Sequence, residues 1–411
     1  MADTTARPSV EEQVDLLMQG TDYGDPELAR AMTLELRARL VEAREQGRPL
    51  KVYCGFDPRT SDLHIGHTVP MRKLRQFQLL GHDVTFLIGT YTSLVGDPSD
   101  KDRLRPRLKQ EEVMANARTY AEQAFRILDR GRTTVRYNHE WLAELRLGEL
   151  IEIASHFSVQ QFLTRETFRR RWDDGDALYL HETLYAVMQA VDACTLGVDV
   201  QVGGSDQLFN IVAASRKLMA SRGLRPNVAV IVGILPGTDG TTKMSKSQGN
   251  HIRIMAPPEE MYAQIMSIPD RAMESYFAMV SPLGPPEVRD IMEKVRSELL
   301  HPRDAKRRLA REIVGMFHDE DASHRAEEAF VRVFTERRPP EEMPEASLVA
   351  QEGTAALLVR CGLASSRSEA RRLLAEGAVR LDDVRLNDAM SPPPGPGVLR
   401  VGRRFVRLVG S

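Results

Sequence analysis

Two histidines three residues apart, His64 and His67, follow the apolar run of residues 50–56. The run predicts a buried strand that Asp57-Pro58 ends, and apolar residues at helical spacing predict a helix directly after it. The histidines therefore lie where a strand passes into a helix N-terminus, and there unpaired N–H groups and the helix dipole attract anions. Two imidazoles at such a position predict phosphate chemistry.

Two lysines with the same spacing, Lys243 and Lys246, lie much later in the chain, in the polar loop of residues 236–250. Glycines flank this loop, and a predicted buried strand, residues 228–235, precedes it. A mobile loop of this kind can close over a polyphosphate and neutralise the charge that develops in a transition state. An ordinary solvated surface loop is the alternative interpretation.

Three polar residues share one face of a predicted helix, residues 182–196, that is otherwise apolar. Tyr185, Gln189 and Asp192 are spaced i, i+4 and i+7. An unpaired buried polar group costs about 1–3 kcal/mol, so either the protein or a small polar ligand must supply partners. Asp97 follows another predicted strand, and it is either a cap or turn residue or a ligand for an ammonium group.

The elements that position these residues alternate between buried strands and helices. A strand–turn–helix–strand pattern occurs twice, the second time through the Gly-Gly turn of residues 203–207. This pattern predicts an α/β fold with a doubly wound parallel sheet, in which the loops after the strands line a ligand crevice. The expected domains are an N-terminal helical segment packed on the catalytic domain (1–48), a Rossmann-like catalytic domain with a helical insertion at about 106–197 (49–255), an all-helical domain (256–338), a linker (339–350) and a small α+β domain (351–411).

Composition narrows the class of protein. The 411 residues are 42% hydrophobic and 28% charged, which is typical of a soluble globular chain with two or three domains. The net charge of −2 conceals a basic tail, since residues 351–411 hold ten arginines and six acidic residues, and this predicts a polyanionic partner. Three scattered cysteines, no signal-peptide pattern and no apolar run of roughly 20 residues predict a cytoplasmic protein without a membrane segment.

Together these stretches resemble the class I aminoacyl-tRNA synthetases, and among them the bacterial tyrosyl-tRNA synthetases. Residues 64–67 match the HIGH signature and residues 243–247 match KMSKS, in the right order and each just past a strand. The resemblance runs from about residue 50 to 282. Residues 368–379 separately resemble an S4-type RNA-binding domain. The basic helix face of Arg367, Arg371 and Arg372 would there follow a phosphate backbone, with a solvated face as the alternative.

The resemblance implies a tyrosine–tRNA ligase. Such an enzyme activates L-tyrosine with ATP to tyrosyl-adenylate, releases pyrophosphate, and transfers tyrosine to the 3′ end of tRNA(Tyr). The resemblance also implies ATP as its Mg²⁺ complex, no structural metal, and a homodimer, whose interface we expect near residues 151–163. The implied site residues are His64, His67, Lys243 and Lys246 for catalysis; Tyr53, Asp97, Tyr185, Gln189, Asp192 and Gln207 for tyrosine; Gly55, Asp57, His64, Gly66, His67, Gly204, Asp206 and Lys246 for ATP; and Arg367, Arg371 and Arg372 for tRNA.

The sequence departs from the family pattern near the phosphates. Arg59 stands where the family usually has threonine, and Asp100 and Asp102 replace small residues, which leaves the roles of Lys101 and Arg105 open.

Three alternatives belong to other functional classes. The complete KMSKS loop and the S4-like tail argue against another HxGH nucleotidyltransferase. The intact histidines and lysines argue against an RNA-binding paralogue without catalysis. Tyr53, Asp192 and the tail argue against a tryptophanyl enzyme.

Overall fold

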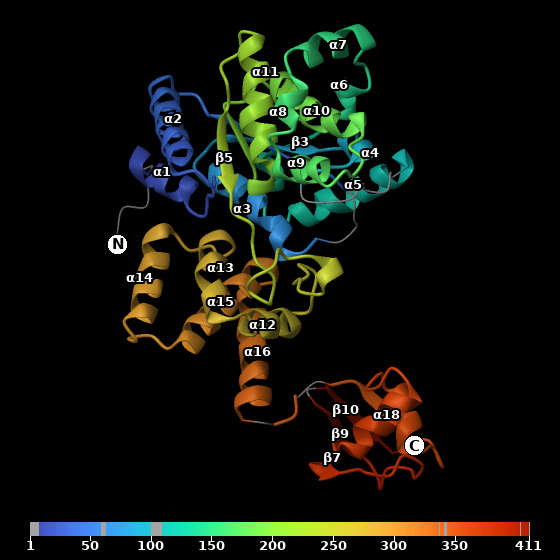
Figure 1. Cartoon of the computed structure of the whole chain (residues 1–411). Helices are drawn as coiled ribbons and strands as arrows, with labels where there is room; N and C mark the ends of the chain where they lie inside the picture. Colours follow the sequence, from blue (N-terminus) through green and yellow to red (C-terminus); the bar gives the residue numbers. More distant parts are fainter. Residues whose placement is uncertain are drawn as a thin grey trace. The chain divides into compact units, whose positions relative to one another are not determined.

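The computed structural model describes residues 8–58, 63–99, 109–336, 338–340, 343–402 and 404–410. The chain forms two compact units, residues 1–323 and 324–411 (Figure 1). The expected all-helical domain therefore belongs, as far as residue 323, to the same compact unit as the sheet. Arg59, Lys101 and Arg105 lie outside the described residues.

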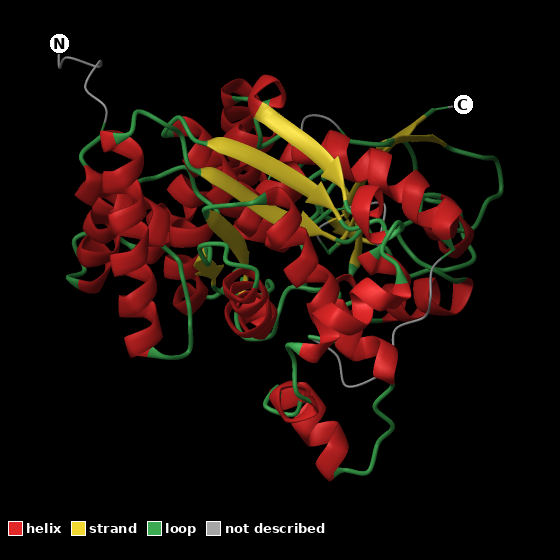
Figure 2. Ribbon diagram, turned by 90° about the horizontal axis from the view of Figure 1, so that it is seen from above, coloured by secondary structure: helices red, strands yellow, loops and turns green. Residues whose placement is uncertain are grey.

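A parallel five-stranded sheet forms the centre of the larger unit. Its strands are β1 (Lys51–Phe56), β2 (Asp83–Ile88), β3 (Thr133–Tyr137), β4 (Val200–Gly204) and β5 (Val228–Val232). Their order is β3-β2-β1-β4-β5, and every neighbouring pair is parallel. Helices lie on both faces of the sheet (Figure 2), so strands such as β5, whose residues are all buried, consist of continuous apolar runs.

The strand order reverses between β1 and β4, which makes this the switch point where ligands bind in doubly wound sheets. The predicted fold class is confirmed. The segment expected as a helical insertion also contributes β3 to the sheet edge.

Eleven α-helices precede β5 in the described part of the chain. They are α1 (Val10–Met18), α2 (Pro26–Glu45), α3 (Ile65–Leu79), α4 (Thr92–Val95), α5 (Gln110–Ala124), α6 (His139–Leu142), α7 (Leu147–Ser155), α8 (Val159–Phe162), α9 (Glu166–Asp173), α10 (Leu180–Leu196) and α11 (Arg216–Ser221). Helix α10 stops at Gly197, which adopts the left-handed conformation at φ 56°. The later helices are α12 (Pro258–Met266), α13 (Met273–Met279), α14 (Pro285–Arg296), α15 (Pro302–Phe317) and α16 (Glu320–Phe330).

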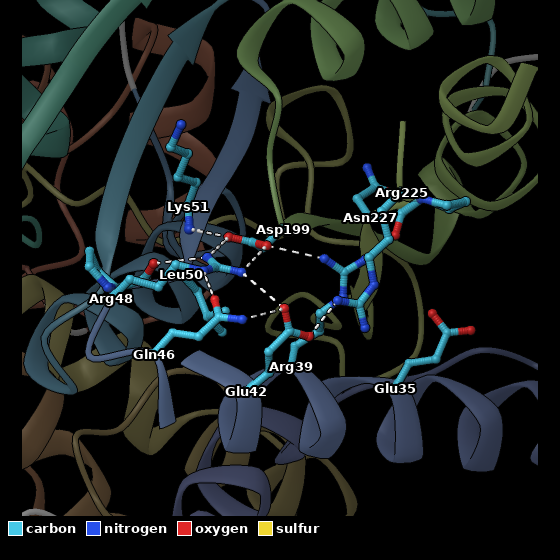
Figure 3. A network of polar contacts seen from close by, with 12 residues as sticks. Glu35, Arg39, Glu42, Gln46, Arg48, Leu50, Lys51, Asp199, Arg225 and Asn227 are labelled. Atoms are coloured by element: carbon cyan, nitrogen blue, oxygen red, sulfur yellow. Dashed lines mark hydrogen bonds and ion pairs between the residues drawn. The ribbon is translucent and has the colours of Figure 1, made fainter. Parts of the chain in front are cut away.

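The N-terminal helices are fastened to the sheet by buried polar contacts. Asp199, next to the first residue of β4, forms ion pairs with Arg39 (3.1 Å) and Arg48 (2.8 Å) and accepts the Lys51 N–H (Figure 3). Burial disfavours the carboxylate, but the hydrogen bonds from Arg48 and Lys51 outweigh it and hold the pKa of Asp199 below its ordinary value. This network joins α2 to the start of β1 and β4, at the sheet edge opposite the carboxyl ends.

The smaller unit has its own mixed sheet and its own apolar core. Its elements are β6 (Glu345–Ser347), α17 (Thr354–Arg360), α18 (Arg367–Ala375), β7 (Val379–Leu381), β8 (Val384–Arg385), β9 (Gly397–Val401) and β10 (Arg404–Val409). The strand order is β6-β10-β9-β7-β8. Leu357, Leu374 and Leu399 lie in the core between the helices and this sheet. Within the described ranges of both units, no helix is long and apolar enough to cross a membrane.

Candidate active site

The two histidines lie at the N-terminus of α3, beyond the carboxyl end of β1. The His64 N–H donates to Nδ1 of His67 at 3.2 Å, and the two ring centroids are 3.7 Å apart. Because Nδ1 of His67 accepts this bond, the neutral ring carries its proton on Nε2 and offers a donor there. A Cβ at Gly66 would lie 3.1 Å from Nδ1 and Cε1 of His64, so a side chain at this position would crowd the ring.

Both imidazoles are neutral at pH 7. Burial, followed by neighbouring imidazoles and lysines, lowers the pKa of His64 to about 2. Burial and then Lys243 and Lys246 lower the pKa of His67 to about 4. The imidazoles therefore offer uncharged hydrogen bonds to an anion, while the lysines supply positive charge within electrostatic reach of both rings.

The loop that carries the lysines is held in shape by Asp239 and Asn250. Asp239 accepts the N–H groups of Thr241 (2.7 Å) and Thr242 (2.8 Å) and an Nδ2 bond from Asn250 at 2.6 Å. The Ser245 N–H donates to Oδ1 of Asn250 at 2.8 Å. The buried Asn250 thus closes the two ends of the loop on each other.

The same loop is joined to the turn after β4. Lys243 Nζ lies 3.0 Å from Oδ2 of Asp206, and Lys246 begins the single helical turn of Lys246–Gln248. A Cβ at Gly204 would lie 2.6 Å from Oδ1 of Asp206, so glycine lets this carboxylate fold back over its own turn. Lys243, assigned to catalysis, and Asp206, assigned to ATP, are thus in direct contact beyond β4.

Asp57, the first residue after β1, connects residues assigned to ATP with residues assigned to tyrosine. Its carboxylate accepts hydrogen bonds from the hydroxyls of Thr92 (2.8 Å) and Tyr185 (3.1 Å). A Cβ at Gly89 would lie 2.1 Å from Oδ1 of Asp57, so this close approach requires glycine. Gly55 is different, because it is exposed and a Cβ there would meet only Leu87, at 3.8 Å.

Tyr185, Gln189 and Asp192 form a polar stripe along α10, and Asp192, at its inner end, is 3% exposed. Trp141 Nε1 donates to it at 2.8 Å and Asn138 Nδ2 at 3.2 Å, yet burial raises its pKa to about 7. The Tyr53 hydroxyl is buried and has no hydrogen-bond partner in the described part of the chain. Burial and then Asp192 raise the pKa of Tyr53. A ligand hydroxyl that donates to Asp192 and accepts from Tyr53 would satisfy both groups.

Two further residues assigned to tyrosine, Asp97 and Gln189, offer acceptor oxygens. Asp97 accepts a hydrogen bond from Nε2 of Gln207 at 2.6 Å, and burial followed by Asp206 raises its pKa. The buried Oε1 of Gln189 has no partner among the described residues. A carboxylate and an amide oxygen in these positions suit an ammonium group.

The three arginines assigned to tRNA lie on α18 of the smaller unit, more than 100 residues after the other assigned residues in the sequence. Arg367, Arg371 and Arg372 are exposed, and Arg372 pairs with Glu376 at 2.8 Å. The apolar side of α18, with Ala370 and Leu374, is buried instead. Over the described residues, no group of three His, Cys, Asp or Glu side chains could hold a metal ion.

Several site residues were missed from the sequence. Thr92, Asn138 and Trp141 lie in the segments after β2 and β3, which the rule on strand ends predicts in general but not residue by residue. Arg165 is buried and donates to the Ser99 hydroxyl at 2.5 Å, beside Asp97. His251 follows Asn250 directly, and its ring centroid lies 6.1 Å from that of His64.

Two family models and several curated relatives match this chain. The family model of tRNA synthetases class I (W and Y) matches residues 45–335, and the S4 domain model matches residues 355–391. The tyrosine–tRNA ligase of Moorella thermoacetica is 44% identical over 379 residues, 91% of each chain. That of Thermotoga maritima is 43% identical over 364 residues, 88% of this chain and 90% of the relative.

Solved structures show the same fold. A C-terminally truncated Aspergillus nidulans mitochondrial tyrosyl-tRNA synthetase aligns with a TM-score of 0.62 at 25% identity, over 81% of this chain and 96% of that one. The Archaeoglobus fulgidus tyrosyl-tRNA synthetase complexed with L-tyrosine aligns with a TM-score of 0.59 at 21% identity, over 78% and 100% of the two chains.

Proposed function

The chain belongs to the tyrosine–tRNA ligases, a family of class I tRNA synthetases, and we propose the following roles for its residues in the two steps of the reaction. The ligase activates L-tyrosine with ATP and then transfers it to tRNA(Tyr). The observation that carries the assignment of residues is that three features meet at the carboxyl ends of the strands: the His64–His67 pair, the Lys243–Lys246 loop and the α10 stripe.

In the first step the tyrosine carboxylate attacks the α-phosphate of ATP and pyrophosphate leaves. No protein nucleophile takes part, so catalysis consists of positioning and of stabilising charge on the transferring group. We assign His64 and His67 to the α-phosphate, where neutral N–H donors bond the oxygens as charge develops. Lys243 and Lys246 neutralise the β- and γ-phosphates, and Lys243 must exchange its ion pair with Asp206 for the triphosphate.

ATP enters this scheme as its Mg²⁺ complex. The carboxylates of Asp57 and Asp206 lie on the ATP side of the site, and the magnesium ion belongs to the substrate. The glycines at positions 55, 66 and 204 let the nucleotide approach the backbone.

Selection of tyrosine rests on the two ends of the α10 stripe. Asp192 and Tyr53 read the phenol hydroxyl, while Asp97, Tyr185 and Gln189 hold the ammonium group and Gln207 lies near the carboxylate. Phenylalanine would leave the buried Tyr53 hydroxyl without a partner and would deprive the buried Asp192 carboxylate of the hydrogen bond from the substrate, at about 1–3 kcal/mol each. Trp141 and Asn138 fix the Asp192 carboxylate while leaving lone pairs for the substrate.

The second step requires tRNA, which we assign to the exposed arginine face of α18 and to the helices α12–α16. We further propose a cytoplasmic homodimer that uses the surface around α7 and α8. Three apolar side chains there are largely exposed in the single chain: Leu147 (72%), Ile151 (62%) and Val159 (70%). Burial of such a patch in a symmetric interface would account for it.

The assignment of the lysines is tested by Lys246→Ala in ATP–pyrophosphate exchange. Loss of one preorganised charge donor should lower the exchange rate about 10²–10³-fold. Lys294→Ala is the matched control, because Lys294 lies on α14 and pairs with Asp290; it should exchange at the wild-type rate. An unchanged rate in Lys246→Ala would contradict the assignment.

A further inference from the structure

A third histidine belongs to the site, and neither the HIGH nor the KMSKS motif contains it. His251 follows the Lys243–Lys246 loop, and its ring stands at 62° to that of His64 with centroids 6.1 Å apart. Nδ1 of His251 and Nδ1 of His64 are both buried, and neither has a hydrogen-bond partner in the described ranges. His64 thus has two imidazole neighbours, with ring centroids at 3.7 Å for His67 and 6.1 Å for His251.

The backbone before His251 is fixed within the lysine loop, and the backbone after it is fixed to the segment around His64. Before it, Asn250 closes the lysine loop through Asp239 and Ser245. After it, the Ile65 N–H donates to the Ile252 carbonyl at 2.9 Å and the Ile254 N–H donates to the Leu63 carbonyl at 3.2 Å. These two bonds form a short antiparallel pairing between the residues around His64 and those around Arg253.

His251 is therefore the side chain at the point where the lysine loop meets the histidine segment. We propose that His251 is a positioning residue for adenylate formation, which holds the His64 ring in the orientation that bonds the phosphate and transmits the closure of the lysine loop to it. The inference rests on the proposed role of His64. It predicts that the effect of His251 passes through His64 and does not act on tyrosine binding.

A double-mutant cycle on the full-length chain tests this directly, with single-turnover adenylate formation and the KM values for ATP and tyrosine as readouts. His251→Phe keeps a ring and removes both nitrogens. It should slow adenylate formation about tenfold, the size of coupling typical of side chains in contact, and leave the tyrosine KM within about twofold. In a His64→Ala background the same change should cost less than about twofold, because the residue through which it acts is gone.

Two further variants separate polar positioning from bulk. His251→Asn, whose amide takes the place of Nδ1, should retain a rate within about threefold of wild type. If His251→Phe fails to fold in thermal unfolding, His251→Ala carries the test, with the same expected losses in the two backgrounds. Met255→Ala is the control for disturbance of the segment, since Met255 is 52% exposed and lies four residues on; it should leave the rate unchanged.

The outcomes distinguish failure of the His251 inference from failure of the proposed function on which it rests. Equal losses from His251→Phe in both backgrounds, or no loss from it in either, would overturn the positioning role. A wild-type rate in His64→Ala alone would instead overturn the proposed role of His64 in catalysis.

Discussion

Replacing Tyr53 by phenylalanine should move stability and selectivity in opposite directions. The hydroxyl is buried on β1, and no described residue accepts from it or donates to it. A buried polar group without a partner costs about 1–3 kcal/mol, so its removal should raise the free energy of unfolding by about 1 kcal/mol. The same hydroxyl is assigned to the phenol of tyrosine, and loss of one neutral hydrogen bond weakens binding by about 0.5–1.5 kcal/mol.

The expected result of Tyr53→Phe is therefore a stability that rises and a preference for tyrosine over phenylalanine that falls about 2- to 13-fold. Urea unfolding followed by tryptophan fluorescence measures the first, and kcat/KM in ATP–pyrophosphate exchange with each amino acid measures the second.

Tyr23→Phe is the matched control. The Tyr23 hydroxyl is equally buried but donates to the Ala229 carbonyl at 2.7 Å, so this variant should lose about 0.5–1.5 kcal/mol of stability and keep its selectivity. A Tyr53→Phe protein that is destabilised by 1 kcal/mol or more, with unchanged selectivity, would refute the reasoning. The Tyr53 hydroxyl would then have a structural partner rather than a substrate.

Three further predictions concern other parts of the molecule. Burial raises the pKa of Asp192 from 3.8 to about 7, so the folded state holds this proton more tightly than the unfolded state, and stability falls as pH rises from about 4 to 7. Asp192→Asn should remove up to about 4 kcal/mol of that fall, and an unchanged pH dependence of urea unfolding would contradict it. Asp199→Ala leaves the buried Arg39 without its carboxylate and should cost about 3–5 kcal/mol of stability, whereas Glu11→Ala, which breaks an exposed pair, should cost less than about 1 kcal/mol; similar losses in the two variants would show that burial of the pair is unimportant. Replacing Arg367, Arg371 and Arg372 together by alanine should weaken tRNA charging and flatten its salt dependence while sparing ATP–pyrophosphate exchange, and equal loss of both activities would contradict an RNA-binding role for α18.

The sheet and the phosphate side of the site could be predicted from sequence because their signals are local. Apolar runs mark β1, β2, β4 and β5, and the two spaced pairs, His64 with His67 and Lys243 with Lys246, each follow such a run. The rule that ligands bind at the carboxyl ends of parallel strands then brings the pairs together without any knowledge of distances.

The parts that could not be predicted depend on contacts between distant segments. Trp141 bonds Asp192 and Tyr185 bonds Asp57 across 51 and 128 residues of sequence, and no periodicity records such pairings. The end of helix α5 at Ala124 is likewise not marked in the sequence, because helix boundaries depend on packing that a propensity pattern does not contain. The sequence does not mark His251 either, because its contact with His64 joins distant segments and a lone histidine after a polar loop has no distinguishing spacing.

The central claim is that this site activates tyrosine on ATP, and ATP–pyrophosphate exchange in the absence of tRNA tests it most directly. Tyrosine, tryptophan and phenylalanine are assayed in parallel with the wild-type chain. The account predicts rapid exchange with tyrosine and at least about 30-fold lower kcat/KM with phenylalanine, since the Tyr53 hydroxyl is left unpaired and Asp192 loses the substrate's hydrogen bond, at 1 kcal/mol or more each. Exchange that depends on tryptophan alone, or no exchange with any of the three, would contradict it.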